Sequence, residues 1–434
     1  MRARREPLRY ILIVDTSGAE EIETSALAVA QQLAEWATRR GVPLTWAVDT
    51  LSARRLSRWL NRRNDPPQDD ALLVVPAKSW LVGEGWDQEA ERIVTLRERL
   101  PERFFTARAE AQRWLPWAEF SVFGADWKEF LLIEALEAIG AAGLWGYRWN
   151  ELSSRAVDRG APFGFFYASR TRHQSAGPPV STVVGVPRCS PPVATWRRMP
   201  PEPEAETMSP LAGRLPFSEP RPDEVAEILV ATAECAELNA WNAVVHTLSL
   251  LGLAAEGEAA IERLSELWER VQTLGFRPDR LSSAVQAYRQ RFAVTEPCVT
   301  FAGWHEPVEG GEQLLREGYF YDDRLQIGVP EGTVQPALYH NYLTPSLKSL
   351  DLSEPEAPAL RGFLPARHRD RLALELEFEA PKPMPYALLL WEDHRHLRLL
   401  ESDVAEVRWL GKNGLLLLFD LEAGINSFHV VLSI

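Results

Sequence analysis

The amino-acid sequence predicts an α/β fold over residues 1–293, a (β/α) barrel, followed by an all-β sandwich over residues 294–434. Up to Phe292, short aliphatic runs alternate with amphipathic segments of helical period, which is typical of a parallel sheet covered by helices. After Phe292, apolar and polar residues alternate between turn signals, which is typical of antiparallel strands. The length of 434 residues also exceeds that of an ordinary single domain.

The first strand and helix set the pattern. Residues 9–14 are an apolar strand that stops at Asp15, and residues 22–40 are a helix that Gly41 terminates as a C-terminal cap. The apolar residues of this helix recur at steps of four and three: Ile22, Ala26, Val29, Leu33 and Trp36. Asp15 therefore lies at the C-terminal rim of the sheet, either as a functional carboxylate or as the cap of the next helix.

The alternation continues through the first part of the chain. Further strands are predicted at 43–48, 71–75, 103–106, 120–123, 143–149, 163–168, 181–186 and 241–247. Further helices are predicted at 52–63, 86–100, 127–140, 222–237, 257–275 and 280–292, with Pro101 ending the second of these. Prolines crowd residues 187–223, either as an interdomain linker or as a loop wrapped over the barrel; the wrapped loop is favoured because the alternation resumes after it.

The last part of the chain carries the strand signals of a sandwich. The run "RLALELEF" places Leu372, Leu374, Leu376 and Phe378 on one face, as in a half-buried antiparallel strand. Further apolar runs follow at short intervals, and Asn413–Gly414 predicts a hairpin turn between two of them.

Composition excludes several classes of function. A net charge of -14 argues against nucleic acid as a partner. The basic cluster at residues 1–5 precedes only a short apolar run, residues 10–14, too short for a signal peptide or a membrane span, so we expect a cytoplasmic protein without a membrane partner. The three cysteines, Cys189, Cys235 and Cys298, are far apart and predict buried, reduced thiols. The sequence does not predict the oligomeric state.

Four segments resemble a known family. They are "ILIVDTSGAEE" (11–21), "GVPLTWAVDT" (41–50), "AWNAVVHTLSLLG" (240–252) and "LGFRPDRLSSAVQAYRQRF" (274–292). In this order the chain resembles the polysaccharide deacetylases of the NodB-homology type over about residues 9–292. The resemblance implies a (β/α) barrel, a carbohydrate substrate, and a divalent metal ion held by an aspartate and a His-x-x-x-His pair.

The sequence departs from that family at its metal ligands. Asp15 is followed by Thr16 rather than by a second aspartate, and the third strand, "LLVVPAKSWLVG", has no histidine. No histidine occurs between Met1 and Arg172, so no cofactor is expected. An all-oxygen site for magnesium or calcium stays open, because six carboxylates fall near predicted strand ends: Asp15, Glu20, Glu21, Asp49, Glu119 and Asp126.

Two residues are candidates for catalysis and two for substrate binding at the same pocket. The resemblance places Asp15 and His246 at the rim, as general base and general acid; otherwise they are a cap and a hydrogen-bonded core histidine. Lys78 and Trp80 lie where the metal-binding histidines would be, and could bring a positive charge and a stacking face; otherwise they are an exposed lysine and a packed indole.

Aromatic residues are the other candidates for substrate binding. The segment "GLWGYRWNE" sets Trp145, Tyr147 and Trp149 on one side of a strand, with Asn150 at its end. Aromatic faces beside amides and carboxylates suit sugar rings, although the same indoles could simply pack the core. Glu119 and Asp126 join these candidates.

The functional expectation is therefore a carbohydrate-related protein, catalytically degenerate, that binds a glycan without metal-dependent hydrolysis. One alternative is an active carbohydrate deacetylase, a hydrolase acting on C–N or ester bonds, with a non-standard site. Another is a scaffold whose β-sandwich binds a protein partner through an exposed apolar patch.

Overall fold

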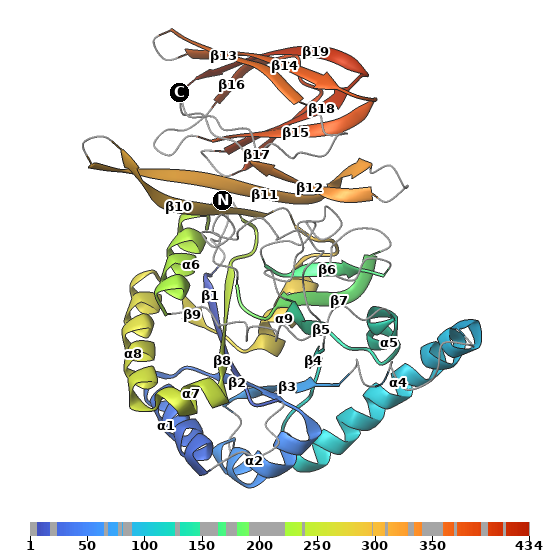
Figure 1. The fold of residues 1–434 in the computed structure, drawn as a ribbon, viewed down its shortest axis with the longest axis vertical. Coiled ribbons are helices and arrows are strands. Elements are labelled where there is room, and N and C mark those ends of the chain that lie inside the picture. The colour runs from blue at the N-terminus through green and yellow to red at the C-terminus, as the bar shows by residue number, and fades with distance from the viewer. Residues whose placement is uncertain are drawn as a thin grey trace, which may run out of the picture.

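The computed structural model describes residues 7–17, 24–64, 68–76, 80, 89–125, 131–147, 164–170, 180–190, 222–236, 239–296, 298–308, 311–328, 334–340, 359–368, 371–391, 398–410 and 414–433. Figure 1 shows an α/β part, built from the first two thirds of the chain, with three further β-sheets beyond it. No helix within the described ranges combines the length and the apolar character needed to cross a bilayer.

The α/β part is organised by one curled sheet whose strands run in the order β6-β7-β5-β4-β3-β2-β1-β8, with β9 paired to β1. Its strands are β1 (Arg9–Asp15), β2 (Leu44–Val48), β3 (Asp70–Val74), β4 (Val122–Gly124), β5 (Gly143–Tyr147), β6 (Phe166–Ser169), β7 (Val180–Pro187), β8 (Ala243–Ser249) and β9 (Arg277–Pro278). All pairings are parallel except that of β6 with β7. The parallel sheet predicted from the alternation is confirmed.

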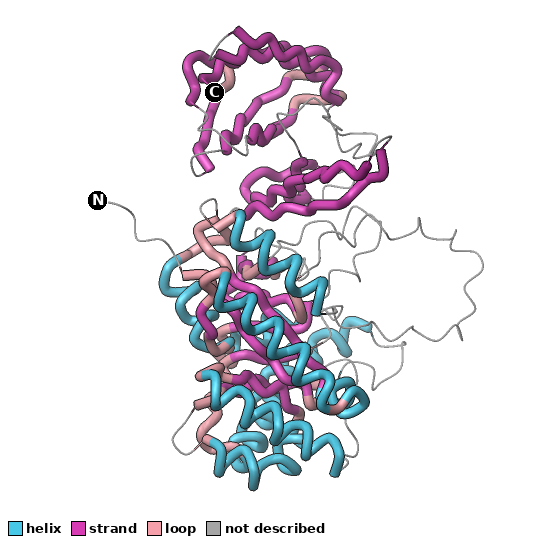
Figure 2. The backbone as a smooth tube through the Cα atoms, turned by 90° about the vertical axis from the view of Figure 1, so that its left-hand side faces the viewer, coloured by secondary structure: helices cyan, strands magenta, loops and turns pink. Residues whose placement is uncertain are grey.

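Helices cover the convex face of this sheet, as Figures 1 and 2 show. The helices of the α/β part are α1 (Thr24–Arg40), α2 (Thr50–Arg63), α4 (Glu89–Trp114), α5 (Leu132–Ala138), α6 (Pro222–Glu234), α7 (Leu250–Glu256), α8 (Glu258–Thr273) and α9 (Leu281–Arg291). Alternate residues of β1, such as Leu12 and Val14, share a core with Leu33 of α1, Leu56 of α2 and Phe104 of α4. The apolar faces of these amphipathic helices therefore pack against the convex face of the sheet.

The concave face of the sheet is filled by α9. Ile11 and Ile13 of β1 share a second core with Leu281, Val285 and Tyr288 of that helix. β1 therefore sends its odd-numbered residues to the concave core and its even-numbered residues to the helix layer. This alternation decides where each candidate site residue points.

An aromatic cluster fills the gap between the two edge strands of the sheet. Phe165 precedes β6, Trp241 precedes β8, and both rings contact Tyr288 of α9 at centroid distances of 5.9 and 5.3 Å. Phe292 lies 5.0 Å from Tyr288, and the hydroxyl of Tyr167 donates to the carbonyl of Phe292 at 2.6 Å. Much of the aromatic content of the sequence is thus used for packing, which was the structural alternative to sugar binding.

A short segment, residues 188–190, connects the end of β7 to the edge of β8, and we call it the strap. The backbone N–H of Ser190 donates to the carbonyl of Val245 at 2.8 Å, and the N–H of Val245 donates to Ser190 Oγ at 2.9 Å. Thr247 Oγ1 also donates to the carbonyl of Arg188. Among the described residues, β6 and β8 end the sheet and do not pair with each other, so the sheet is a curled half-barrel, and the strap is hydrogen-bonded to β8 at its open side. Of the predicted loop 187–223, residues 191–221 lie outside the described residues, and Pro222 and Asp223 begin α6.

Two predictions in the α/β part are wrong: the strand at 103–106 and the end of a helix at Pro101. Residues 103–106 are not a strand, because α4 continues through Pro101 to Trp114. Leu100, Phe104, Ala107 and Ala111 are buried at steps of four, three and four, so burial of this stripe outweighs the proline. The predicted helix 257–275 is α8. A short helix that the sequence did not predict, α7, precedes it, and Gly257 separates the two.

The last part of the chain forms three antiparallel sheets. Sheet β10-β11-β12 comprises Cys298–Val308, Gly311–Gly328 and Val334–His340; sheet β13-β14-β19-β16 comprises Ala359–His368, Arg371–Ala380, Gly424–Ser433 and Arg398–Ser402; sheet β15-β18-β17 comprises Met384–Trp391, Gly414–Leu421 and Glu406–Leu410. The last two sheets share one core, formed by Leu374, Leu376 and Phe378 of β14 with Leu417 and Phe419 of β18. The sheet β10-β11-β12 lies between them and the α/β part (Figures 1 and 2), so residues 294–434 are not one sandwich throughout. β17 and β18 are paired as the Asn413–Gly414 turn predicts, although Asn413 lies outside the described residues.

Candidate functional site

Asp15 ends β1 at the C-terminal rim of the sheet, as the sequence predicts. Its side chain is 8% exposed. Asp15 Oδ1 accepts hydrogen bonds from the backbone N–H of Ser17 at 2.9 Å and from Ser17 Oγ at 2.6 Å. Asp15 Oδ2 accepts from Arg188 Nη2 at 2.5 Å. The carboxylate is therefore buried, and it is held by an arginine that lies 173 residues away in the chain.

Arg188, the first residue of the strap, links Asp15 to the aromatic candidate Trp145. Its guanidinium carbon lies 5.1 Å from the centroid of the Trp145 ring, and the indole Nε1 of Trp145 donates to the carbonyl of Arg188 at 3.3 Å. Trp145 is 2% exposed, and one face of its ring is covered by the guanidinium. Asp15, Arg188 and Trp145 thus form one cluster, which we call the rim triad.

His246 does not join the rim triad. In the register of β1 and β8, His246 is opposite Leu12, and Thr247 is opposite Ile13, so His246 points into the convex helix layer. There its Nδ1 lies 2.6 Å from the hydroxyl of Tyr10, and the Tyr10 ring also contacts Trp268 of α8. Burial lowers the pKa of His246 to about 4 and raises the pKa of Tyr10. The sequence placed His246 on the correct strand, but its side chain is on the face opposite Asp15.

Trp80 and Glu119 lie away from Asp15. The Trp80 ring packs edge-on against Phe104 of α4 at 5.3 Å, and its carbonyl accepts from Arg103. Glu119 is exposed in the segment that precedes β4, which places it at the N-terminal rim of the sheet, opposite Asp15. Glu119 therefore lies at the opposite rim from Asp15, and the Trp80 ring packs into the helix layer.

The remaining candidates are only partly described. Tyr147 is the last residue of β5, where the pairing with β7 shifts by one residue after Trp145, so the alternation used to group Trp145, Tyr147 and Trp149 is interrupted. Four other candidates lie outside the described residues: Lys78, Asp126, Trp149 and Asn150. Of the carboxylates considered for an all-oxygen site, Glu20 and Glu21 also lie outside them.

Asp49, at the end of β2, is a helix cap. Its Oδ1 accepts from the backbone N–H of Ser52 at 2.6 Å, and Ser52 Oγ accepts from the N–H of Asp49 at 2.9 Å. This reciprocal pair is the capping box of α2. Asp49 is therefore the N-cap of α2, which is the structural role that the sequence left open for Asp15.

The donors around Asp15 do not fit the divalent metal that the family resemblance implies. A guanidinium occupies Oδ2, and its positive charge opposes a second cation at the same oxygen. Within the described ranges, no three His, Cys, Asp or Glu side chains gather closely enough to hold a metal ion. We therefore derive no chemistry through a metal at Asp15.

Sequence reasoning missed Arg188. It lies in "GVPRCS", at the end of a strand and the start of a proline-rich segment, and no motif marks it. A weak signal was available, because a basic residue directly after a predicted parallel strand falls on the same rim as Asp15.

Comparisons with known proteins were made for the whole chain. No protein-family model and no curated protein sequence matches it. A crystal structure of a "putative polysaccharide deacetylase" from Mycobacterium smegmatis aligns with 68% of this chain and 95% of its own, at 15% sequence identity and a TM-score of 0.42. At this TM-score and identity, the alignment assigns neither a family nor a site residue to this chain.

Proposed function

We propose that the protein is a carbohydrate-binding relative of the polysaccharide deacetylases in which hydrolysis has been lost. The state of Asp15 carries the proposal. A general base or a metal ligand needs an accessible lone pair, whereas the Asp15 side chain is only 8% exposed and its carboxylate already accepts three hydrogen bonds, one of them from Arg188. The four segments that resemble the family support the carbohydrate class.

The position of the rim triad supports a binding role. In parallel α/β sheets, ligands bind beyond the carboxyl ends of the strands, and this is the rim where Asp15 and Arg188 lie. The Arg188 guanidinium, whose side chain is 21% exposed, and Ser17 are polar groups suited to sugar hydroxyls. Because Arg188 covers a face of Trp145, we assign sugar stacking to Trp149 and hydrogen bonding to Asn150, the neighbouring candidates in the sequence.

The test uses purified protein and N-acetylated oligosaccharides such as chitopentaose. Isothermal calorimetry should show binding, assays for released acetate should show none, and plasma mass spectrometry should find no stoichiometric transition metal in the wild type or in Asp15→Ala. Trp149→Ala should weaken binding about tenfold or more, equivalent to roughly 1.4 kcal/mol. Glu119→Gln, at the opposite rim, is the matched control and should bind like the wild type.

Asp15→Asn separates binding from catalysis. In the proposed function an amide still forms hydrogen bonds, so chitopentaose binding is largely retained. Acetate release by the wild type that Asp15→Asn abolishes would establish the hydrolase alternative. Absence of binding to any acetylated sugar would overturn the carbohydrate assignment and leave the scaffold alternative.

A further inference from the structure

The outward face of α2 carries a row of exposed arginines. Arg54, Arg58 and Arg62 are each separated by four residues, so they follow one another along one face of the helix. We call these three residues the arginine row. Helix α2 has five arginines and no Asp or Glu, although the net charge of the chain is -14. The outward face of α2 is therefore basic on a protein that is acidic as a whole.

Neither ion pairing nor the helix dipole accounts for the arginine row. Among the described residues, none of its three members forms an ion pair with a carboxylate, although Arg54 lies 5.4 Å from the centroid of the Trp114 ring. The helix dipole favours a cation in the last turn, such as Arg62, but Arg54 and Arg58 precede that turn. Like charges four residues apart also repel each other on a helix. Other exposed arginines do have an acidic partner: Arg97 pairs with Glu134, Arg170 with Glu137 and Arg263 with Glu256.

The outward face of β14 carries a row of glutamates with nearly the same spacing. Glu375, Glu377 and Glu379 are exposed and alternate with the core residues of the strand, and we call them the glutamate row. Two residues of a strand span about 6.8 Å, and four residues of a helix span about 6 Å. The two rows are therefore about 14 and 12 Å long, so their charges can be paired one to one.

The glutamate row can accept further hydrogen bonds. Glu375 is bound through Oε1 by His429 Nδ1, and Glu379 is bound through Oε2 by Arg361 Nε, both at 2.6 Å. Each of these carboxylates has a second oxygen, and among the described residues the Glu377 carboxylate has no hydrogen bond or ion pair. Guanidinium groups bind carboxylates through paired N–H donors, so the two rows are chemically complementary.

The two rows lie at opposite ends of the molecule. Figure 1 shows α2 at one end of the longest axis and β13, β14 and β19 at the other. The buried residues of α2, such as Leu56 and Leu60, pack towards the sheet of the α/β part, and Leu374 and Phe378 of β14 pack towards β18. Both rows therefore face away from the molecule, where a second copy can reach them.

We propose that the arginine row of one copy docks on the glutamate row of a second copy, so that copies associate head to tail. Leu51, which is 43% exposed one turn before Arg54, and Ile425, which is 71% exposed opposite Glu379 on β19, add an apolar contact at matching ends of the rows. Because two different surfaces meet, further copies can add in the same way. The contact does not involve the rim triad, so it is independent of the proposed carbohydrate function.

The association is weak and sensitive to salt. Exposed ion pairs contribute little energy individually, and copies of an acidic protein repel each other outside the contact. Sedimentation velocity of the full chain at low ionic strength should show a sedimentation coefficient that rises with protein concentration. Added sodium chloride should return it to the value of the monomer. A monomer at every concentration would overturn the proposal.

Charge reversal identifies the two surfaces. One variant replaces the arginine row by glutamate, and the other replaces the glutamate row by arginine. Each variant alone should associate about tenfold or more weakly than the wild type, because like charges then face each other. An equimolar mixture of the two variants should associate again, because each row of one variant meets an opposite row on the other. A mixture that stays monomeric contradicts the proposal.

A matched control separates this contact from the overall charge. The control reverses three exposed arginines elsewhere, Arg97→Glu, Arg263→Glu and Arg270→Glu, which changes the net charge as much as reversal of the arginine row. It should associate like the wild type, and an equal loss would overturn the proposal. If a reversal variant does not fold, Arg58→Gln gives a milder test and should weaken association about threefold. Unchanged association in Arg58→Gln would also count against the proposal.

Discussion

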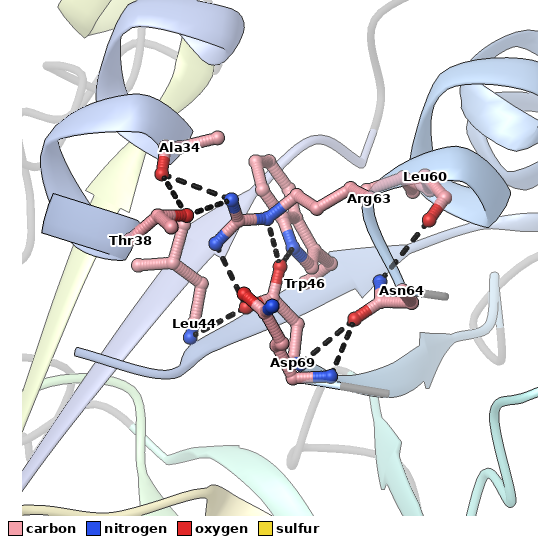
Figure 3. Close-up of polar contacts among 9 residues, drawn as sticks. Ala34, Thr38, Leu44, Trp46, Leu60, Arg63, Asn64 and Asp69 are labelled. Carbon is pink, nitrogen blue, oxygen red and sulfur yellow. Dashed lines mark hydrogen bonds and ion pairs between the residues drawn. The ribbon is translucent and has the colours of Figure 1, made fainter. Parts of the chain in front are cut away.

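Two buried arginine–aspartate pairs lie at opposite rims of the sheet, and their surroundings differ. At the N-terminal rim, Asp69 has a fully buried side chain and accepts from both Arg63 and the indole of Trp46, as Figure 3 shows. The backbone N–H of Leu44 is a further donor to it. At the C-terminal rim, Asp15 and Arg188 have side chains that are 8% and 21% exposed.

The difference separates a structural pair from a candidate binding pair. Arg63 also donates to the carbonyl of Ala34 and to Thr38 Oγ1, so its network links α1, α2 and the starts of two strands (Figure 3). The Asp69 network is enclosed, whereas the more exposed member of the other pair is Arg188, at the rim where α/β sheets bind ligands. The same two residue types thus have different roles, set by the rim at which they lie.

The largest expected effect is the loss of the Asp69 network. Asp69→Ala leaves a buried guanidinium, an indole N–H and a backbone N–H without their acceptor, so the free energy of unfolding should fall by about 3–5 kcal/mol. Urea unfolding measures this, with the exposed Glu35→Ala as a control that should change it by less than about 0.5 kcal/mol. A loss below about 1 kcal/mol for Asp69→Ala would remove the contrast between the rims.

The second prediction concerns His246, which is buried in the convex helix layer beside Tyr10 and should make the free energy of unfolding depend on pH. Because burial lowers the pKa of His246 to about 4, from about 6.5 when unfolded, the unfolded state binds the proton more readily between these values. The contribution of neutral His246 is therefore complete above pH 6.5 and is lost as pH falls towards 4, by up to about 3 kcal/mol. The free energy of unfolding, measured between pH 4 and 6.5, should depend less on pH in His246→Gln than in the wild type. The control is His429→Gln, which should keep the pH dependence of the wild type, since the imidazole of His429 is partly exposed beside Glu375.

The third prediction tests the more open pair. Asp15→Asn keeps the shape and a hydrogen-bonding oxygen, and Arg188 retains contact with solvent, so the free energy of unfolding should fall by about 1–2 kcal/mol. Urea unfolding alongside Asp69→Asn gives the direct comparison. An equal fall in the free energy of unfolding for Asp15→Asn and Asp69→Asn would mean that the Asp15–Arg188 pair stabilises the fold as much as the Asp69–Arg63 pair does.

The smallest effect concerns Asp49, the other carboxylate at the C-terminal rim. Its side chain caps α2, so Asp49→Ala should reduce the free energy of unfolding by about 1 kcal/mol, and Asp49→Ser, which keeps a capping oxygen, should restore most of it. Thermal unfolding of the two variants measures the difference. Rescue by serine would not be seen if Asp49 acted mainly through its charge.

Most of the α/β fold could be predicted from the sequence, because strands and helices have different apolar periods. β1, β2, β3, β7 and β8 lie within two residues of their predicted positions. The strand predicted at 103–106 is wrong, because short apolar runs fit either period and only tertiary burial of Phe104 decides. The short β9 gave no signal, since its two residues pair with β1 through tertiary contact alone.

The candidate site was harder to predict than the fold. Asp15 could be placed because a strand that stops at a carboxylate marks the rim. Arg188 could not be linked to it, because a contact across 173 residues leaves no local pattern. For His246 the strand was predictable, but the face was not, since β8 is buried on both faces and its sequence does not alternate.

The N-terminal end of α9 bears on the order of folding. The N-cap residue, Arg280, makes no side-chain capping hydrogen bond; the N–H of Leu281 donates to Thr45 Oγ1 of β2, and the N–H of Ser282 donates to Asp70 of β3. These acceptors lie 236 and 212 residues earlier in the chain, so the helix gains its caps only after the neighbouring strands have assembled. We therefore expect α9 to dock late and to complete the concave core around strands that are already paired.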